Sequence, residues 1–171
     1  MARIELSIRY TLDNEKGFVN RADDKGGPTN LGITLPILGK FLGRQVGIED
    51  LQLLTLKNVI PIYQEFFWLP LKLDQVNDQN MATAIFDIGV NEGQVTDVKL
   101  VQQACNECGA TLEVDGCIGS ATVQALNLQS RPQWIRAYQG LVANHYRTIG
   151  QSNPNFVNGW LARAARLSTL V

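Results

Sequence analysis

The sequence lacks most of the short motifs that identify common enzyme classes. Its 171 residues include a single histidine, His145. There is no Walker phosphate loop, no His-Glu-x-x-His metal-binding helix and no Gly-x-Ser-x-Gly nucleophile turn. These absences exclude the P-loop nucleotide hydrolases and the zinc proteases and α/β-hydrolases that carry those motifs. One histidine also leaves little room for a catalytic triad.

Long apolar runs and an export signal are also missing. The amino terminus, residues 1–5, has no apolar run after its basic residue, so it predicts neither a signal peptide nor a membrane-spanning helix. We therefore expect synthesis in the cytoplasm and no stable membrane insertion. The three cysteines form an odd set without an export signal, which fits a reducing compartment.

Cysteine and histidine are too few to indicate a metal site. Cys105 and Cys108 form a lone Cys-x-x-Cys pair, with Cys117 nearby and His145 as the one possible fourth ligand. Without a second paired motif, we interpret the cysteines as small buried hydrophobes. We interpret His145 as a satisfied core or boundary residue. The prediction is a protein without metal or other cofactors.

Charged residues are few and unevenly placed. They make up 18% of the chain against 45% apolar residues, which predicts a folded domain with a substantial core. Residues 131–171 hold five arginines and no acidic residue, so they carry +5 while the remainder carries −6. These arginines either form a basic face for an anionic polymer or pair with acids of the remainder, and pairing is the preferred interpretation. No basic run interleaved with aromatics indicates nucleic-acid binding.

Apolar periodicity and breaker residues predict a mainly α-helical chain. The first helix is expected to end just before Glu15, and the third to be kinked by Pro61. Aromatic residues at helical spacing over residues 63–68 are typical of a core stripe. The predicted helices run from residue 4 to before 15, 34 to 43, 56 to 67, 78 to 93, 96 to 109, 120 to 126, 130 to 150 and 156 to 170.

The stretch Asn14–Thr34 is polar and irregular between two such helices. Its Gly26-Gly27-Pro28 sequence is incompatible with a helix interior. A loop fixed at both ends by packed structure is a common place for chemistry. Glu15 would follow the carboxyl end of the first helix, where the helix dipole disfavours a negative charge and raises the pKa of a carboxyl group. A raised pKa suits a general acid.

The same stretch resembles the signature of the glycoside hydrolase family 108 muramidases, which cut peptidoglycan. The resemblance rests on Glu15, Gly17 and the run Asp24–Thr34, with the spacing between the two parts kept. Lys16 stands where the family usually has glycine, and Lys25 and Pro28 also depart from the usual pattern.

Later segments extend the resemblance to nearly the whole chain. Residues 86–93, with Asp87 and Asn91, and residues 159–163 are similar to that family, and residues 114–122 resemble small helical peptidoglycan-binding modules. The resemblance implies a lysozyme-like catalytic half, residues 1–94, and a peptidoglycan-binding-type half, residues 95–171, packed as one compact unit. The implied fold is mainly α, with at most a short hairpin around Asn20–Gly32. Buried Asp87 is either a hydrogen-bond hub, which we prefer, or part of a cleft floor.

The activity implied by the resemblance is that of an N-acetylmuramidase cleaving the MurNAc–GlcNAc β-1,4 bond. Glu15 takes the family's catalytic position as general acid. Asp24 is either the second carboxylate or a cap of the following glycine turn, and the two roles stay open. Retention or inversion of the anomeric centre also stays open.

Further residues are candidates for contact with the sugar. Thr29 and Asn30 are predicted to bind the substrate's acetamide group or a positioned water, with turn capping as the alternative. The resemblance places Tyr63 and Asn91 near the site, although the pattern alone favours a core role for Tyr63.

Three other functions compete with the muramidase. A lytic transglycosylase needs one glutamate and yields anhydro products. A non-catalytic wall-binding or export-helper protein needs no carboxylate, and a nucleic-acid binder would bind with steep salt dependence. The preferred partner is the glycan strand of peptidoglycan, reached after release or export, and nucleic acid is not expected.

Overall fold

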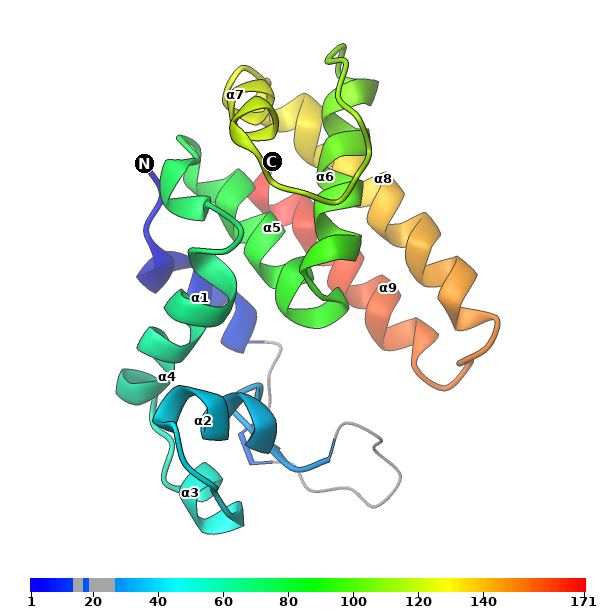
Figure 1. Cartoon of the computed structure of the whole chain (residues 1–171). Coiled ribbons are helices and arrows are strands. Elements are labelled where there is room, and N and C mark those ends of the chain that lie inside the picture. The colour runs from blue at the N-terminus through cyan, green and yellow to red at the C-terminus, as the bar shows by residue number, and fades with distance from the viewer. Residues whose placement is uncertain (14–16, 19–26) are drawn as a thin grey trace.

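The structure is a computed structural model that describes residues 1–13, 17–18 and 27–171 (Figure 1). Glu15 and Asp24 lie outside these residues. Helices make up most of what is described, which confirms the mainly α fold. The α-helices are α1 (Ile4–Leu12), α2 (Leu35–Leu42), α3 (Ile48–Gln52), α4 (Leu56–Tyr63), α5 (Gln79–Glu92), α6 (Gln94–Glu107), α7 (Ser120–Asn127), α8 (Arg131–Gly150) and α9 (Val157–Arg166). Shorter helical segments are η1 (Gln64–Trp68), η2 (Leu73–Gln75) and η3 (Leu167–Leu170).

Local chemistry explains where several helices begin and end. Helix α2 starts directly after Thr34 with Pro36 in its first turn, and it ends at Gly43, whose φ of 64° is left-handed. Helix α5 is capped by Asp78, whose Oδ1 accepts hydrogen bonds from the amides of Asn80 and Met81 at 2.9 and 3.0 Å. These ends were predicted from the sequence.

A kink at Pro61 was predicted, and the structure shows a wider, π-helical turn directly after α4. The proline lies inside α4, and the chain continues as the π-helical turn η1, in which the Leu69 amide donates to the carbonyl of Gln64 at 3.0 Å. A π turn brings residues five apart onto nearly the same face. Tyr63 and Trp68 are therefore both buried, which confirms the predicted core stripe.

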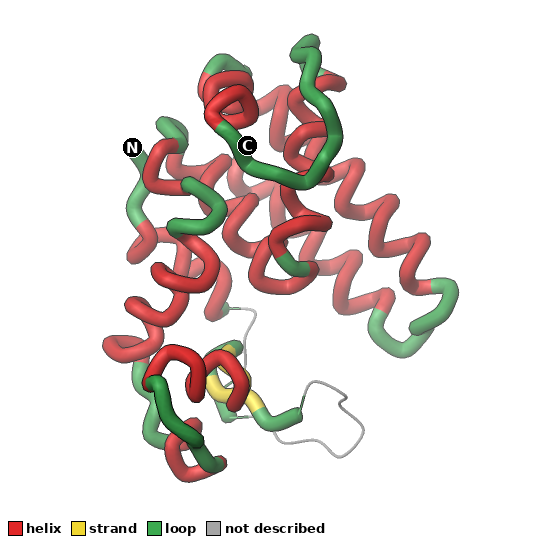
Figure 2. The backbone as a smooth tube through the Cα atoms, viewed as in Figure 1, coloured by secondary structure: helices red, strands yellow, loops and turns green. Residues whose placement is uncertain are grey.

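The described strands form a single hairpin, β1 (Thr29–Asn30) with β2 (Ile33–Thr34), shown in yellow in Figure 2. Leu31 and Gly32 connect them with φ values of 49° and 73°. Two consecutive positive φ angles are typical of the two-residue hairpin turn whose twist matches that of the strands. The strands thus lie at residues 29–34, later than the predicted range of Asn20–Gly32.

Helix α5 forms the centre of the molecule (Figure 1). All residues from Met81 to Gly89 are buried, so α5 is covered on every side, as a helix without a polar face must be. Helix α1 packs on it from one direction, and α6 and α8 pack from the other. The core residues of these helices form one continuous cluster.

Both ends of the chain meet the start of α5. The amide of Ala2 donates to the carbonyl of Val76 at 2.9 Å, and the side-chain amide of Asn80 donates to the carbonyl of Leu170 at 3.0 Å. Helices α8 and α9 form an antiparallel pair that covers α6 and α5. In the part of the chain that the structure describes, no helix is both long and apolar enough to cross a membrane.

Two sequence-based details are wrong. The helix expected from Thr96 begins at Gln94, with Gly93 as its capping residue. Phe156, expected to point inward, is 56% exposed. It instead stacks on Trp160 with ring centroids 5.8 Å apart. Phe156 lies at the start of α9, at the spacing of the inward-facing residues but beyond the part of the helix that the other described elements cover. The helical period therefore did not distinguish a buried from an exposed aromatic position.

Candidate active site

The hairpin is held in place by two of the predicted site residues. The buried side-chain amide of Asn30 donates to the carbonyl of Leu51 at 2.7 Å, which ties β1 to α3. The Tyr63 hydroxyl donates to the carbonyl of Leu31 at 2.9 Å and fixes the turn to the end of α4. The Tyr63 ring is fully buried against Phe86, with ring centroids 5.6 Å apart.

The carboxyl end of α1 is bound to α9 by a single arginine. The Arg166 guanidinium donates to the carbonyl of Tyr10 at 2.9 Å and lies over the Tyr10 ring, 4.1 Å from its centroid. The same group is 4.0 Å from a carboxylate oxygen of Asp13. Half-burial raises the pKa of the Tyr10 hydroxyl, so the ring is neutral beside the guanidinium. Asp13 directly follows α1 and precedes Glu15 by two residues in the sequence.

The carboxyl end of α5 faces α8 through polar side chains. Asn91 donates from Nδ2 to Glu92 Oε1 at 2.8 Å and to the hydroxyl of Tyr146 at 3.3 Å. Glu92 Oε2 is 2.8 Å from Nε2 of His145, so His145 is a satisfied boundary residue. Burial raises the pKa of the Tyr146 hydroxyl, which keeps it a neutral partner for the Asn91 amide.

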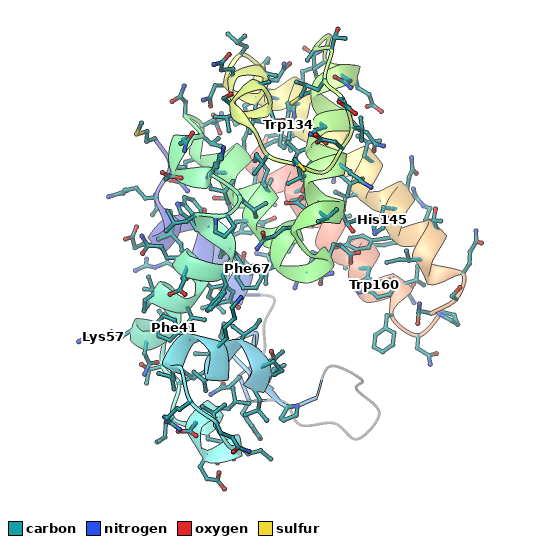
Figure 3. All side chains as sticks on the ribbon, in the orientation of Figure 1. Phe41, Lys57, Phe67, Trp134, His145 and Trp160 are labelled. Atoms are coloured by element: carbon teal, nitrogen blue, oxygen red, sulfur yellow. The ribbon has the colours of Figure 1, made fainter. Side chains whose placement is uncertain are left out.

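A cavity of about 360 Å³ lies between this end of α5 and α9. Its wall contains Asn91, Trp160, Arg163 and Arg166. Trp160 is stacked on Tyr146 with ring centroids 5.8 Å apart. His145 and Trp160 extend from α8 and α9 near each other (Figure 3). Polar groups on an aromatic wall are suited to a sugar, which offers hydroxyl and amide groups together with apolar ring faces.

Asp87 is buried next to Arg163, one of the residues that line this cavity. It has no exposed surface, and one of its carboxylate oxygens is 3.7 Å from Nη1 of Arg163. The same guanidinium nitrogen donates to the Asp87 carbonyl at 3.2 Å. A buried carboxylate requires such a partner. Arg163 thus links Asp87 on α5 to α9 beside the cavity, and the hub and cleft-floor interpretations of Asp87 both stay predictions.

The predicted site residues fall into three groups. Thr29, Asn30 and Tyr63 belong to the hairpin and its support, whereas Asn91 lies apart from them on the cavity wall. Glu15 and Asp24 lie outside the described residues. The roles of all these residues toward substrate stay predictions.

Sequence reasoning missed Arg163 and Arg166 as members of the site. The available signal was the acid-free, arginine-rich segment 131–171, for which pairing with acids was preferred. Arg131, Arg163 and Arg166 do approach Asp78, Asp87 and Asp13, at 3.5, 3.7 and 4.0 Å. The pattern indicated pairing but not which arginine would reach the end of α1.

The cysteines occupy three different environments. Cys105 is buried, Cys108 is half-buried and Cys117 is exposed, so the prediction of buried cysteines is confirmed for Cys105 and wrong for Cys117. Burial raises the pKa of the Cys105 thiol to about 11, so it is an unreactive packing group. Within the described residues, no three His, Cys, Asp or Glu side chains are grouped closely enough to hold a metal ion.

Comparisons with known proteins give two family matches along the chain. The model for glycosyl hydrolase 108 matches residues 8–93, and that for a predicted peptidoglycan domain matches residues 96–165. The solved structure of SagA from Brucella abortus is similar, with a TM-score of 0.72 and 25% sequence identity over 96% of this chain and 94% of that chain. A search of curated proteins found no significant match.

Proposed function

The chain belongs to the glycosyl hydrolase 108 family and is a lysozyme-type peptidoglycan hydrolase, and we propose that it is an N-acetylmuramidase that cleaves the MurNAc–GlcNAc β-1,4 bond. The observation that carries the proposal is the extent of the family match, residues 8–93. This range spans Glu15 and Asp24 and ends with α5, beside the cavity of Asn91 and Trp160.

In this proposal Glu15 is the general acid that protonates the leaving oxygen. Helix α1 ends at Leu12, so Glu15 follows a helix carboxyl end, where the dipole favours the protonated form of a carboxyl group. Asp24 is the candidate second carboxylate, which would stabilise or capture the oxocarbenium-like centre. Its alternative role is to cap the turn at Gly26 and Gly27.

The remaining site residues divide into contact and support. We assign substrate contact to Thr29, on the hairpin, and to Asn91, on the cavity wall. Asn30 and Tyr63 use their polar atoms on the carbonyls of Leu51 and Leu31, which supports a positioning role through the hairpin. In this arrangement the hairpin contacts the substrate on one side, and residues of α9 in the cavity wall contact it on the other.

We also propose that residues 1–94 form the catalytic half and residues 95–171 the binding half of one compact unit. The two family matches meet at residues 93 and 96, which supports this boundary. The core is shared across it, because α5 packs against both α6 and α8. The peptidoglycan-binding-type half therefore supplies part of the wall of the cavity.

Digestion of purified peptidoglycan, with the soluble fragments identified by mass spectrometry, tests the proposed activity. Wild type should release muropeptides with reducing ends. Glu15→Gln should be slower by about 10²–10⁴-fold, because a positioned general acid is worth that much. Glu5→Gln is the matched control: it removes an exposed carboxylate from the first turn of α1 and should leave the rate unchanged.

Asp24→Asn separates the two roles of Asp24. Asparagine caps turns as well as aspartate does, so a capping role predicts a rate close to that of wild type. A chemical role predicts a large loss. Fragments ending in 1,6-anhydro sugars would instead make the protein a lytic transglycosylase. Binding to peptidoglycan without any cleavage would disprove the proposed activity.

A further inference from the structure

A groove of about 470 Å³ runs between α8 and α9, away from the cavity described above. We call it the α8–α9 groove. Its α8 side includes Arg136, Gly140, Ala143 and Arg147. Its α9 side includes Leu161, Ala164 and Ala165, whereas the cavity near α1 uses Ala162, Arg163 and Arg166 of the same helix. The two hollows therefore lie on different faces of α9.

Arg136 and Arg147 lie at opposite ends of one stripe on α8. The lining positions 136, 140, 143 and 147 are offset by four, seven and eleven residues, which is the repeat of a single helix face. Eleven residues of α-helix span about 16 Å. Between the two arginines, this face of α8 carries only Gly140 and Ala143. Their small size leaves the middle of the groove deeper than its ends.

These two arginines differ from the other three of the arginine-rich segment, each of which is within 4.0 Å of a described carboxylate. Neither forms an ion pair with any residue between 27 and 171 or in the described amino-terminal residues. Arg147 is oriented by a hydrogen bond from Nη1 to Asn144 Oδ1 at 2.8 Å. No acidic residue lines the groove. The groove therefore presents uncompensated positive charge at both ends.

The floor of the groove consists of small residues, with the polar side chains of Gln139 and Asn144 beside them. A Cβ added to Gly140 would meet nothing within 4 Å, so space is open above it. Gln139 donates from its side-chain amide to the carbonyls of Ala164 and Ala165 at 3.1 and 3.2 Å, which holds α9 against α8. Such a surface accepts methyl-sized side chains and a closely approaching backbone.

We propose that the α8–α9 groove binds the carboxylate-bearing peptide stem of peptidoglycan. This inference rests on the proposed function, since it takes its ligand from the same polymer. The amino sugars of the glycan strand carry no free carboxylate once the peptide is attached, so a pair of arginines matches the peptide rather than the sugar. An extended peptide of about five residues spans about 16–18 Å, close to the separation of the two arginines. Alanine methyl groups in the stem fit the low floor between them.

Calorimetric or NMR titration of the full-length protein with the free stem pentapeptide tests this site. Arg136→Gln and Arg147→Gln should each weaken binding about tenfold or more, because a hydrogen-bonded ion pair with a carboxylate is lost. Amidation of the peptide carboxylates should weaken binding similarly. Lys57→Gln is the charge-matched control, since it removes an exposed cation from α4, far from the groove (Figure 3).

Gly140→Leu tests the groove without changing charge. The leucine side chain would fill the space above the floor, and leucine has a higher helix propensity than glycine, so the variant should fold and lose peptide binding. Gly140→Ala should fold and retain most of it. Gly140→Leu and the arginine variants should all keep their rate of cleavage of glycan from which the peptides have been removed.

Two results would overturn the inference. One is undiminished peptide binding in Gly140→Leu and in both arginine variants. The other is equal binding of the amidated peptide or preference for an oligonucleotide, which would identify a general anion site. Cleavage of peptidoglycan without peptide binding would also disprove the proposed role of the groove, while the proposed enzymatic activity would stand. Peptide binding without cleavage would disprove the proposed enzymatic activity, while the proposed role of the groove would stand.

Discussion

Arg166 is the side chain that connects the carboxyl-terminal helix to the place where the chain leaves α1. It contacts the carbonyl and ring of Tyr10 and approaches Asp13. A guanidinium can do all three at once because it is planar and carries several donors. Arg166 thus holds the segment that leads to Glu15, although it belongs to the other half of the chain.

Replacing Arg166 with Gln is expected to lower the rate of peptidoglycan cleavage more than it lowers stability. The loss in unfolding free energy should be about 1–2 kcal/mol, from one hydrogen bond and one cation–π contact. The maximal rate should fall several-fold because the acid is less well placed, and the half-saturating substrate concentration should rise because Arg166 also lines the cavity. Arg166→Lys should recover part of the rate.

Arg131→Gln serves as the control for this substitution. Arg131 also bridges the two halves, through an exposed ion pair with Asp78 at 3.5 Å. Exposed pairs contribute about 0–1 kcal/mol, so neither stability nor rate should change much. Equal rate losses in the two variants would mean that Arg166 has no special role at the end of α1.

At the scale of elements, the hairpin β1–β2 depends on its turn and on two side-chain anchors. Gly32 occupies a left-handed conformation with φ of 73°, which a residue with a side chain adopts at a cost. Asn30 of β1 ties the same hairpin to Leu51 of α3, and Tyr63 of α4 holds its turn. The hairpin is therefore a small rigid element directly after the polar loop that contains Asp24.

Gly32→Ala should lower the unfolding free energy by about 1 kcal/mol and also reduce the rate of cleavage, since it distorts the hairpin that carries Thr29. Gly109→Ala is the matched control, because Gly109 has φ of 97° and an added Cβ there would meet nothing within 4 Å. Its cost in stability should be similar, with no loss of rate. Thermal unfolding and the peptidoglycan digestion assay measure the two effects.

At the scale of the whole molecule, a buried pair joins α6 to α8 in the core that both halves share. Asp97 of α6 accepts a short hydrogen bond from the hydroxyl of Tyr138 on α8, and both side chains are fully buried. Burial raises the pKa of the Asp97 carboxyl well above its usual value, while the Tyr138 hydrogen bond acts in the opposite direction. The nearby acids Asp87 and Glu92 raise it further. Gly89 allows this packing, because an added Cβ would lie 2.9 Å from Asp97 Oδ2.

Asp97→Asn should therefore change how stability depends on pH. A carboxyl whose pKa is raised by folding stabilises the protein below its unfolded pKa of about 4 and loses that contribution as pH rises through the folded pKa. Relative to wild type, Asp97→Asn should gain melting temperature between pH 4 and pH 7, because asparagine does not ionise. Tyr138 keeps an acceptor in this variant.

Asp115→Asn provides a control of opposite sign. The side-chain amide of Gln102 and the amide of Cys117 donate to the Asp115 carboxylate at 2.7 and 2.8 Å, which lowers its pKa. Its contribution is present above its unfolded pKa and is lost as pH falls. This variant should be less stable than wild type at pH 7 and at pH 5, with a difference that shrinks as pH falls below about 4. Parallel pH profiles for both variants would contradict the assignment.

The sequence by itself determined the helical elements and the family. Gly43, Asp78 and Pro61 marked ends or irregularities of helices because capping and backbone restrictions act within a few residues. The buried stripe of Tyr63 and Trp68 could also be predicted, because the spacing of apolar residues along a helix is a local pattern. The resemblance around Glu15 and Asp24 identified the family, which the match over residues 8–93 shows.

Only the tertiary structure decided which distant groups meet. Arg166 and Tyr10 are separated by 156 residues, so no local pattern relates them. The same holds for the Asn30 amide on Leu51. It also holds for Arg136 and Arg147, which form no ion pair with a described residue, whereas Arg131, Arg163 and Arg166 do. Phe156 is a case in which the local pattern was right and the conclusion was wrong. It has the helical spacing of the buried residues, but it is exposed because no other element of the described chain packs over it. Contacts between elements follow from the packing of the whole core, and local sequence does not encode that packing.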